Sequence, residues 1–411
     1  MRPYPTLGLL YISAFLKEQK KNVLLIDSTF LTIDEWKSAI IEKQPKLVAF
    51  YSNLMTKITV LELCKWIKQT LPNTITVVGG PDVTYNCENY LKAGFNYTVS
   101  GEGEQTMLAL INALEQKQSV DKLPGIAYLE NETLIQHPDK VAFIEMELLP
   151  FPDRTSIPLE QYLTTWKKHH GKRTLNISTQ RGCPYTCKWC STAVYGQSYR
   201  RNKPERVVAE ILFLKEQFNV EALWFVDDVF TVSHKWIAEL HAAFAANNLV
   251  IPFECITRAE RLTDTVVQQL KEMGCFRIWI GAESGSQRII ERMDRRVTLE
   301  KVQEMMQKTR ALGMETGTFI MVGYPGETES DIRATLKHIE ACNPHLLTVT
   351  KAYPIKGTDL YAEIEQEITF APNWSTSTDR EIRFQLPYSD QFYKNAVRYL
   401  VNGWLAHQIG R

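Results

Sequence analysis

Short runs of β-branched and aromatic residues alternate along this chain with amphipathic stretches of helical periodicity. In the first part of the chain this pattern predicts strands at Val23–Asp27, Leu47–Ser52, Ile75–Gly79 and Tyr97–Ser100 and helices near Asp34–Ile41, Thr59–Leu71 and Glu104–Leu114. Strands that alternate with helices form mainly parallel sheets covered on both faces. Residues 1–117 are therefore expected to form a doubly wound, Rossmann-like α/β domain.

The alternation resumes with longer helices after residue 170. Strands are predicted at Asn176–Thr179, Ala222–Val226, Phe253–Thr257, Arg277–Gly281, Thr316–Val322 and Leu347–Lys351. Six such units predict a partial (β/α)6 TIM-like barrel over residues 171–370, with the loops that follow the strands on one rim. Residues 118–170, which include Pro150 and Pro152, are expected to be a linker. The aromatic-rich residues 371–411 are expected to cap the barrel, with contact to a substrate as the weaker alternative.

Composition narrows the class of partner. Of the 411 residues, 44% are hydrophobic and 23% are charged, which is typical of a folded globular chain. Lys and Arg total 47 and so do Asp and Glu, so no basic excess points to nucleic acid, and a small-molecule substrate is expected. The chain has no apolar run long enough for a membrane span, and residues 1–10 do not resemble a signal peptide, so we expect a cytoplasmic protein.

Three of the eight cysteines stand close together as Cys183, Cys187 and Cys190, directly after the first predicted barrel strand. Three thiolates can bind one face of a metal centre and leave a coordination position open. A zinc site completed by a histidine such as His169, His170 or His234 is the alternative. The remaining cysteines are scattered and are expected to be buried apolar residues: Cys64, Cys87, Cys255, Cys275 and Cys342.

The spacing CxxxCxxC after a first barrel strand, with Trp189 before the last cysteine, resembles the radical S-adenosylmethionine (SAM) superfamily. The resemblance implies that the three cysteines hold a 4Fe-4S cluster whose open iron binds SAM, and that an external low-potential flavodoxin or ferredoxin supplies the electron. It also implies SAM contacts from the ends of later strands. These candidates are Trp189, Asp227, Asp228, Arg258, Glu283, Ser284 and Gly323. Trp189 could instead only shield the cluster.

A doubly wound domain ahead of this motif resembles the cobalamin (vitamin B12)-binding subgroup of the superfamily. The resemblance implies a set of cobalamin contacts near the starts of loops and helices: Leu7, Gly8, Ser52, Leu54, Gly79, Gly80, Gly101 and Glu102. If Gly8 is the glycine of the subgroup's Asp-x-His-x-x-Gly signature, Pro3 and Pro5 stand at the aspartate and histidine positions. This loop then supplies no histidine ligand to cobalt.

The second departure is a missing strand. Relatives have a hydrophobic central strand before the position of Pro5, and this chain has four residues there. Its loss would leave backbone groups unpaired on both neighbouring strands. We favour a gene start placed too late over a domain that has lost its cofactor and serves only as a scaffold.

The resemblance favours a cobalamin-dependent methyltransferase that acts on an unactivated carbon, where a radical can react and a nucleophile cannot. Ring formation or rearrangement, as in the anaerobic tetrapyrrole cyclases, stays open as the alternative. A methylthiotransferase would need a second trio of cysteines, and only Cys64 and Cys87 precede the motif. A regulatory protein that binds metal or cobalamin without turnover is the non-enzymatic alternative.

Overall fold

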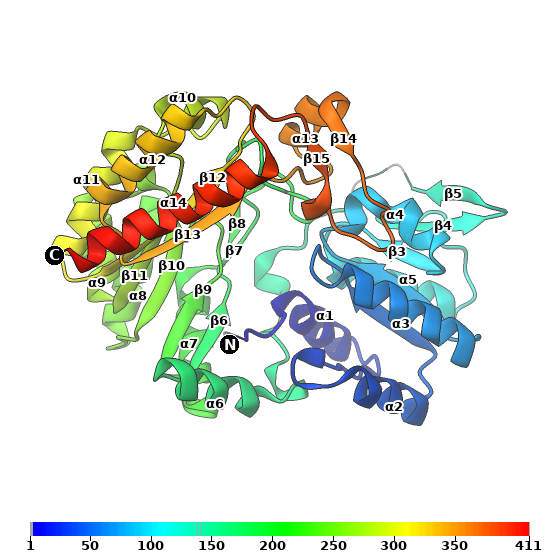
Figure 1. Ribbon diagram of the computed structural model, residues 1–411. Coiled ribbons are helices and arrows are strands. Elements are labelled where there is room, and N and C mark those ends of the chain that lie inside the picture. The colour runs from blue at the N-terminus through cyan, green and yellow to red at the C-terminus, as the bar shows by residue number, and fades with distance from the viewer. Residues whose placement is uncertain (1–2, 138, 140, 411) are drawn as a thin grey trace.

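The computed structural model describes residues 3–137, 139 and 141–410, which form two α/β lobes (Figure 1). The sheet of the N-terminal lobe has the strand order β1-β2-β3-β4-β5. Its strands are β1 (Leu47–Tyr51), β2 (Ile75–Gly79), β3 (Tyr97–Val99), β4 (Ile126–Glu130) and β5 (Thr133–Gln136). The first three are parallel, and β4 and β5 join antiparallel. The helices are α1 (Leu7–Glu18), α2 (Ile33–Lys43), α3 (Lys57–Thr70), α4 (Val83–Lys92) and α5 (Gly103–Glu115).

The strand predicted at Val23–Asp27 is the one element of this lobe that the sequence predicts and the structure lacks. These residues belong to no strand, and β1 lies at the edge of the sheet. A strand requires a hydrogen-bonded neighbour, and none of the described residues supplies one to this segment. Among the described residues, β1 therefore has a hydrogen-bonded neighbour on one side only, which is β2.

Residues 118–170 are not the linker that was expected. They add β4 and β5 to the N-terminal sheet and supply α6 (Leu159–His170) to the barrel. Asn131 and Glu132 connect β4 to β5 with positive φ angles of 49° and 64°. Such a turn joins paired strands tightly, but its usual marker is glycine at the second position. Glu132 stands at that position, so the hairpin has only a weak signal in the sequence.

The C-terminal lobe is an open barrel of six parallel strands in the order β13-β12-β11-β10-β9-β6. The strands are β6 (Thr174–Ile177), β9 (Ala222–Phe225), β10 (Phe253–Thr257), β11 (Cys275–Glu283), β12 (Glu315–Val322) and β13 (Leu346–Lys351). This confirms the predicted partial barrel, with β6 two residues earlier than predicted. The helices between them are α7 (Pro204–Phe218), α8 (His234–Ala246), α9 (Asp264–Glu272), α10 (Gln287–Arg292), α11 (Leu299–Ala311) and α12 (Glu329–Cys342).

The last residues pack on both lobes. A short segment with α13 (Asp359–Ile364), β14 (Ile368–Phe370) and β15 (Arg383–Phe384) leads to α14 (Asp390–Ile409), which packs on α12 and β13. Trp374 from this segment meets Tyr90 of α4 edge to face, with ring centroids 4.8 Å apart. Figure 1 shows this segment above the N-terminal lobe and α14 along the barrel. Among the described helices, none combines the length and apolarity needed to cross a membrane.

Candidate functional site

The three cysteines lie on one loop that is closed at its base by a two-rung antiparallel ladder. Strand β7 (Gln180–Arg181) leads into this cluster loop, residues 182–199, and β8 (Arg200–Arg201) leads out of it. Gly182 begins the loop with φ +82°, and a Cβ there would lie 2.4 Å from the carbonyl oxygen of Ser198. Glycine is therefore required where the two ends of the loop meet.

Asp227 fixes the approach to this loop from the barrel side. Its Oδ1 accepts hydrogen bonds from the backbone nitrogens of Thr179 (2.7 Å) and Gln180 (3.1 Å), and its Oδ2 accepts from Thr179 Oγ1 and pairs with Arg201 at 3.3 Å. The Asp227 side chain is fully buried. Both carboxylate oxygens thus accept hydrogen bonds from Thr179 and Gln180, which lie just before the cysteines. Asp227 therefore positions this segment, a role in addition to the SAM contact that the resemblance implies.

Side chains from three successive strand ends surround the cysteines. Arg258, directly after β10, donates a hydrogen bond from Nη1 to Cys187 Sγ at 3.1 Å. Burial raises the pKa of the Cys183 thiol, and Asp228, which follows β9, raises it further. Cys190 is exposed, but desolvation by the surrounding protein raises the pKa of its thiol, and so do the charges of Asp228 and of Glu283, the last residue of β11. The structure therefore brings these candidates together.

Arg258 is held in place by other groups as well as by the sulfur. Its guanidinium also contacts Glu260 and the carbonyl oxygen of Arg295, and it lies over the Tyr185 ring at 4.0 Å from the centroid. Its side chain is 4% exposed, so its charge is poorly screened by water. A hydrogen bond to a ligand sulfur is one of the contacts by which proteins tune iron–sulfur clusters.

Glu283 reaches the site through an unusual backbone conformation. Its φ is +66°, and the pairing of β11 with β12 shifts register between Gly281 and Glu283. A positive φ is costly for a residue with a Cβ and is maintained where the surrounding structure requires it. Burial raises the pKa of the Glu283 carboxyl, and the positive charge of Arg295, whose Nε lies 3.9 Å from Glu283 Oε1, partly offsets this rise. The bulge therefore turns this carboxyl toward the cysteines.

Three other SAM candidates have contacts within the chain. Ser284 is buried with its hydroxyl 3.4 Å from that of Thr335 on α12. The Gly323 nitrogen donates to Glu327 at 2.6 Å. Trp189 packs in an apolar cluster with Tyr324, a placement that suits a shield.

The donor set of the cluster loop fits an iron–sulfur cluster. The three sulfurs are close enough to interact electrostatically, the carboxyl groups of Asp228 and Glu283 also lie within electrostatic reach of Cys190, and the Cys187 sulfur accepts an N–H donor. Iron–sulfur clusters are bound by thiolates and tuned by hydrogen bonds to sulfur. Among the described residues, no three or more His, Cys, Asp or Glu side chains lie so that they could hold a single metal ion.

Most of the cobalamin candidates lie in the loops that follow the C-terminal ends of the parallel strands β1, β2 and β3. Ser52 is buried and its hydroxyl lies 2.6 Å from that of Tyr90. Gly80 has φ +118°, and a Cβ there would lie 2.3 Å from the Ser52 carbonyl oxygen. The close approach at Gly80 is thus to this chain's own backbone. Leu54 and Gly79 lie beside them, and Gly101, with φ +78°, follows β3.

The N-terminal segment contacts the barrel through its proline carbonyls. Asn176 of β6 donates to the Pro5 carbonyl oxygen at 2.9 Å, and Trp166 of α6 donates to that of Pro3 at 2.7 Å. Leu7 and Gly8 follow as the first turn of α1, and the position of a Cβ on Gly8 is open. The residues at the signature's aspartate and histidine positions therefore join the lobes.

Glu102 and several residues that the sequence analysis did not single out form a buried cluster between the lobes. Glu102 and Glu104, at the start of α5, contact Arg181 and Arg200 at the base of the cluster loop. In the sequence, only the run Gly101–Glu104 draws attention to this cluster. Its partners, Arg181 and Arg200, lie far along the chain, so the sequence does not indicate the contact.

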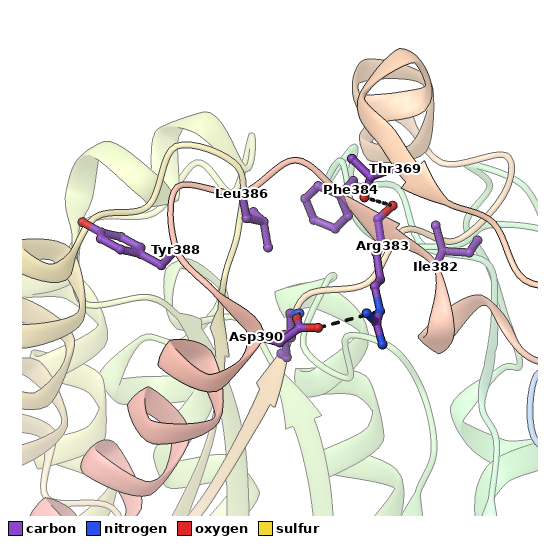
Figure 2. Close-up of a pocket in the computed structure, with 8 residues that line it drawn as sticks. Thr369, Ile382, Arg383, Phe384, Leu386, Tyr388 and Asp390 are labelled. Atoms are coloured by element: carbon purple, nitrogen blue, oxygen red, sulfur yellow. Dashed lines mark hydrogen bonds and ion pairs between the residues drawn. The ribbon is translucent and has the colours of Figure 1, made fainter.

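A cavity of about 180 Å³ lies beside the end of β13 (Figure 2). Lys351 and Arg383 in its wall both pair with Asp390, the latter at 3.7 Å. Its volume is below the roughly 300–1,000 Å³ typical of ligand pockets. We therefore assign it no ligand.

Two family models match separate parts of the chain. The family model of the radical SAM superfamily matches residues 177–339, and that of the B12 binding domain matches residues 2–111. An uncharacterized methyltransferase, PH0819, of Pyrococcus horikoshii is 27% identical over 98% of this chain and 89% of its own length. The anaerobic magnesium-protoporphyrin IX monomethyl ester cyclase of Rubrivivax gelatinosus is 24% identical over 89% of this chain and 67% of its own.

Among solved structures, the radical SAM methyltransferase TsrM from Kitasatospora setae, with cobalamin and a [4Fe-4S] cluster bound, superposes with a TM-score of 0.75. The match has 18% identity and covers 89% of this chain and 72% of TsrM. It confirms the predicted fold, a doubly wound domain followed by a partial barrel.

Proposed function

Since the chain belongs to the radical SAM superfamily and carries a B12-binding domain, we propose that it is a cobalamin-dependent radical SAM methyltransferase. Its substrate is a small molecule that is methylated at an unactivated carbon. The observation that carries the proposal is the convergence of Asp228, Arg258 and Glu283, from three successive strand ends, on the three cysteines of one loop. The methyltransferase relative that spans nearly the whole chain favours methyl transfer over ring formation.

The chain's own residues bind and orient the reacting groups. Cys183, Cys187 and Cys190 hold the cluster, and Arg258 places positive charge beside the Cys187 sulfur. Asp228 and Glu283 accept hydrogen bonds from the amino and hydroxyl groups of SAM. When bound, the cluster, SAM and cobalamin supply one-electron chemistry and a methyl group.

We place cobalamin at the edge of the N-terminal sheet where β1, β2 and β3 end, which is where ligands of doubly wound sheets bind. Leu7, Gly8, Ser52, Leu54, Gly79, Gly80 and Gly101 are its proposed neighbours, whereas Glu102 is engaged with arginines. Because Pro5 has no metal-binding side chain, this loop leaves cobalt without a histidine ligand. A flavodoxin or ferredoxin of the cytoplasm is the proposed electron donor.

The test is anaerobic reconstitution with iron and sulfide, followed by incubation with SAM, cobalamin and a low-potential reductant. We expect a brown iron protein that releases 5′-deoxyadenosine, and no release from Cys187→Ala. S-adenosylhomocysteine should form as well, because a methyl group leaves SAM only in the methyltransferase reaction; a cyclase would form 5′-deoxyadenosine alone. A colourless zinc protein without turnover would refute the enzyme assignment.

A further inference from the structure

We propose that Glu102 and Glu104 are positioning residues for the iron–sulfur cluster, through which the N-terminal lobe holds the base of the cluster loop. The proposal rests on the proposed function only in taking Cys183, Cys187 and Cys190 as cluster ligands. Residues at the start of α5, in the N-terminal lobe, would thus help to position the cluster ligands of the C-terminal lobe.

The ladder at the base of the loop explains why two lobes can hold it. Gln180 pairs with Arg201, and Arg181 pairs with Arg200. Successive side chains of a strand point to opposite faces, so neighbouring rungs of a two-rung ladder face opposite ways. The Arg201 rung meets Asp227 of the barrel, and the Arg181–Arg200 rung meets Glu102 and Glu104.

The contacts on the N-terminal side are buried and well formed. Arg181 Nη2 donates to Glu104 Oε1 at 2.5 Å, and Arg181 Nη1 lies 3.3 Å from Glu102 Oε1. Arg200 also donates to Glu102 through both terminal nitrogens. The side chains of Arg181, Glu102 and Glu104 are each 3–4% exposed. Removal of one partner from such a cluster leaves an uncompensated charge in a place that water does not reach.

The two glutamates are themselves fixed. The backbone nitrogen of Ile144 donates to Glu102 Oε2 at 2.9 Å, and Arg200 returns a bond to the Ile144 carbonyl oxygen at 2.9 Å. A Cβ on Gly103, between the glutamates, would lie 2.6 Å from Ile12 of α1. The start of α5 is thus packed tightly against α1, so its glutamates have a fixed position to which the base of the cluster loop is bound.

Arg181 also reaches beyond the base of the loop. Its guanidinium lies between Tyr11 of α1 and Tyr195, at 5.3 Å and 5.4 Å from the ring centroids. Tyr195 is part of the cluster loop, five residues after Cys190. Loss of the Glu104 contact is therefore expected to loosen the loop on the side of Cys190 as well as at its base.

The experiment measures the access of a reagent to single thiols in the iron-free, full-length protein. Timed alkylation read by mass spectrometry gives a rate for each cysteine, with the fully buried Cys64 and Cys255 as internal references for global unfolding. We expect Glu104→Gln to speed alkylation of the three loop cysteines at least about tenfold relative to both references. Glu115→Gln is the matched control, because Glu115 is on the same helix in an exposed pair with Lys21.

The loaded protein supplies a second readout. Glu104→Gln should release iron to a chelator faster than the wild type, and Glu115→Gln should not. If Glu104→Gln does not fold, Arg200→Gln replaces it, since the Arg200 side chain is 20% exposed and its loss is less severe. Unchanged loop rates, or rates that rise only in parallel with Cys64 and Cys255, would overturn the proposal. Because the iron-free measurement requires no turnover, the result does not depend on the methyl transfer assignment.

Discussion

Substitution of the adjacent residues Asp227 and Asp228 should separate support of the cluster loop from contact with SAM. Asp227 is buried in bonds to Thr179, Gln180 and Arg201, whereas Asp228 is exposed beside the cysteines. Asp227→Asn should lower the stability of the barrel and the amount of iron that it retains. Asp228→Asn should lower SAM cleavage and leave stability unchanged.

The size of the Asp227 effect follows from its contacts. Asparagine keeps one oxygen, which can accept the two backbone bonds, but it removes the charge that faces Arg201. Breaking a buried ion pair by removing one partner costs about 3–5 kcal/mol. Arg201 keeps hydrogen bonds to Thr179 Oγ1 and a position 3.5 Å above the Trp236 ring, so we expect the lower end, about 3 kcal/mol. Domains are stable by only about 5–15 kcal/mol, so this loss is readily measured.

Urea unfolding of the iron-free proteins is the assay, with iron content after reconstitution measured in parallel. The midpoint should fall for Asp227→Asn at an unchanged slope and stay at the wild-type value for Asp228→Asn. Equal stability of all three proteins, with SAM cleavage lost only in Asp227→Asn, would refute the reasoning. It would return Asp227 to the role of a SAM ligand.

Two further predictions concern the loop base and pH. Gly182→Ala should abolish iron binding, because the added Cβ would clash with Ser198 at the other end of the loop. Gly196→Ala is the control, because Gly196 also has a positive φ but open space around it, and this variant should bind iron normally. A similar loss of iron in both variants would show that the φ angle alone matters. Burial raises the pKa of Glu327 to about 7, above its ordinary value of 4.5, so the folded state holds this proton more tightly than the unfolded state. The contribution of Glu327 to the free energy of unfolding therefore falls as the pH rises from about 4.5 to about 7 and is constant above that range. Urea midpoints between pH 5 and pH 8 should change less in Glu327→Gln than in the wild type, and an identical pH dependence would contradict the assignment.

The strands and the cluster loop could be predicted because their signals are local. Phe253–Thr257 and Ile75–Gly79 are short runs rich in β-branched and aromatic residues, and both appear as strands with the predicted bounds. Val23–Asp27 is also rich in apolar residues but pairs with no strand among the described residues, so pairing decides here whether a strand forms.

The roles of single side chains were harder to predict. Asp227 and Asp228 are consecutive, so a register error of one residue exchanges a buried position for an exposed one. Glu104 and Arg181 are 77 residues apart, and nothing in either neighbourhood indicates the other. Glu283 points into the site through a positive φ, which no preference of glutamate indicates.

The return of the C-terminal segment to the N-terminal lobe limits how ligands can exchange. Besides Trp374 on Tyr90, Gly357 is so close to Tyr85 that a Cβ there would lie 2.2 Å from the ring. Besides the chain connection through residues 141–158, residues 353–384 thus form a second bridge between the two halves. Hinged opening of the halves would have to break the second bridge. Exchange of bulky molecules that keeps this bridge intact would proceed by displacement of individual loops.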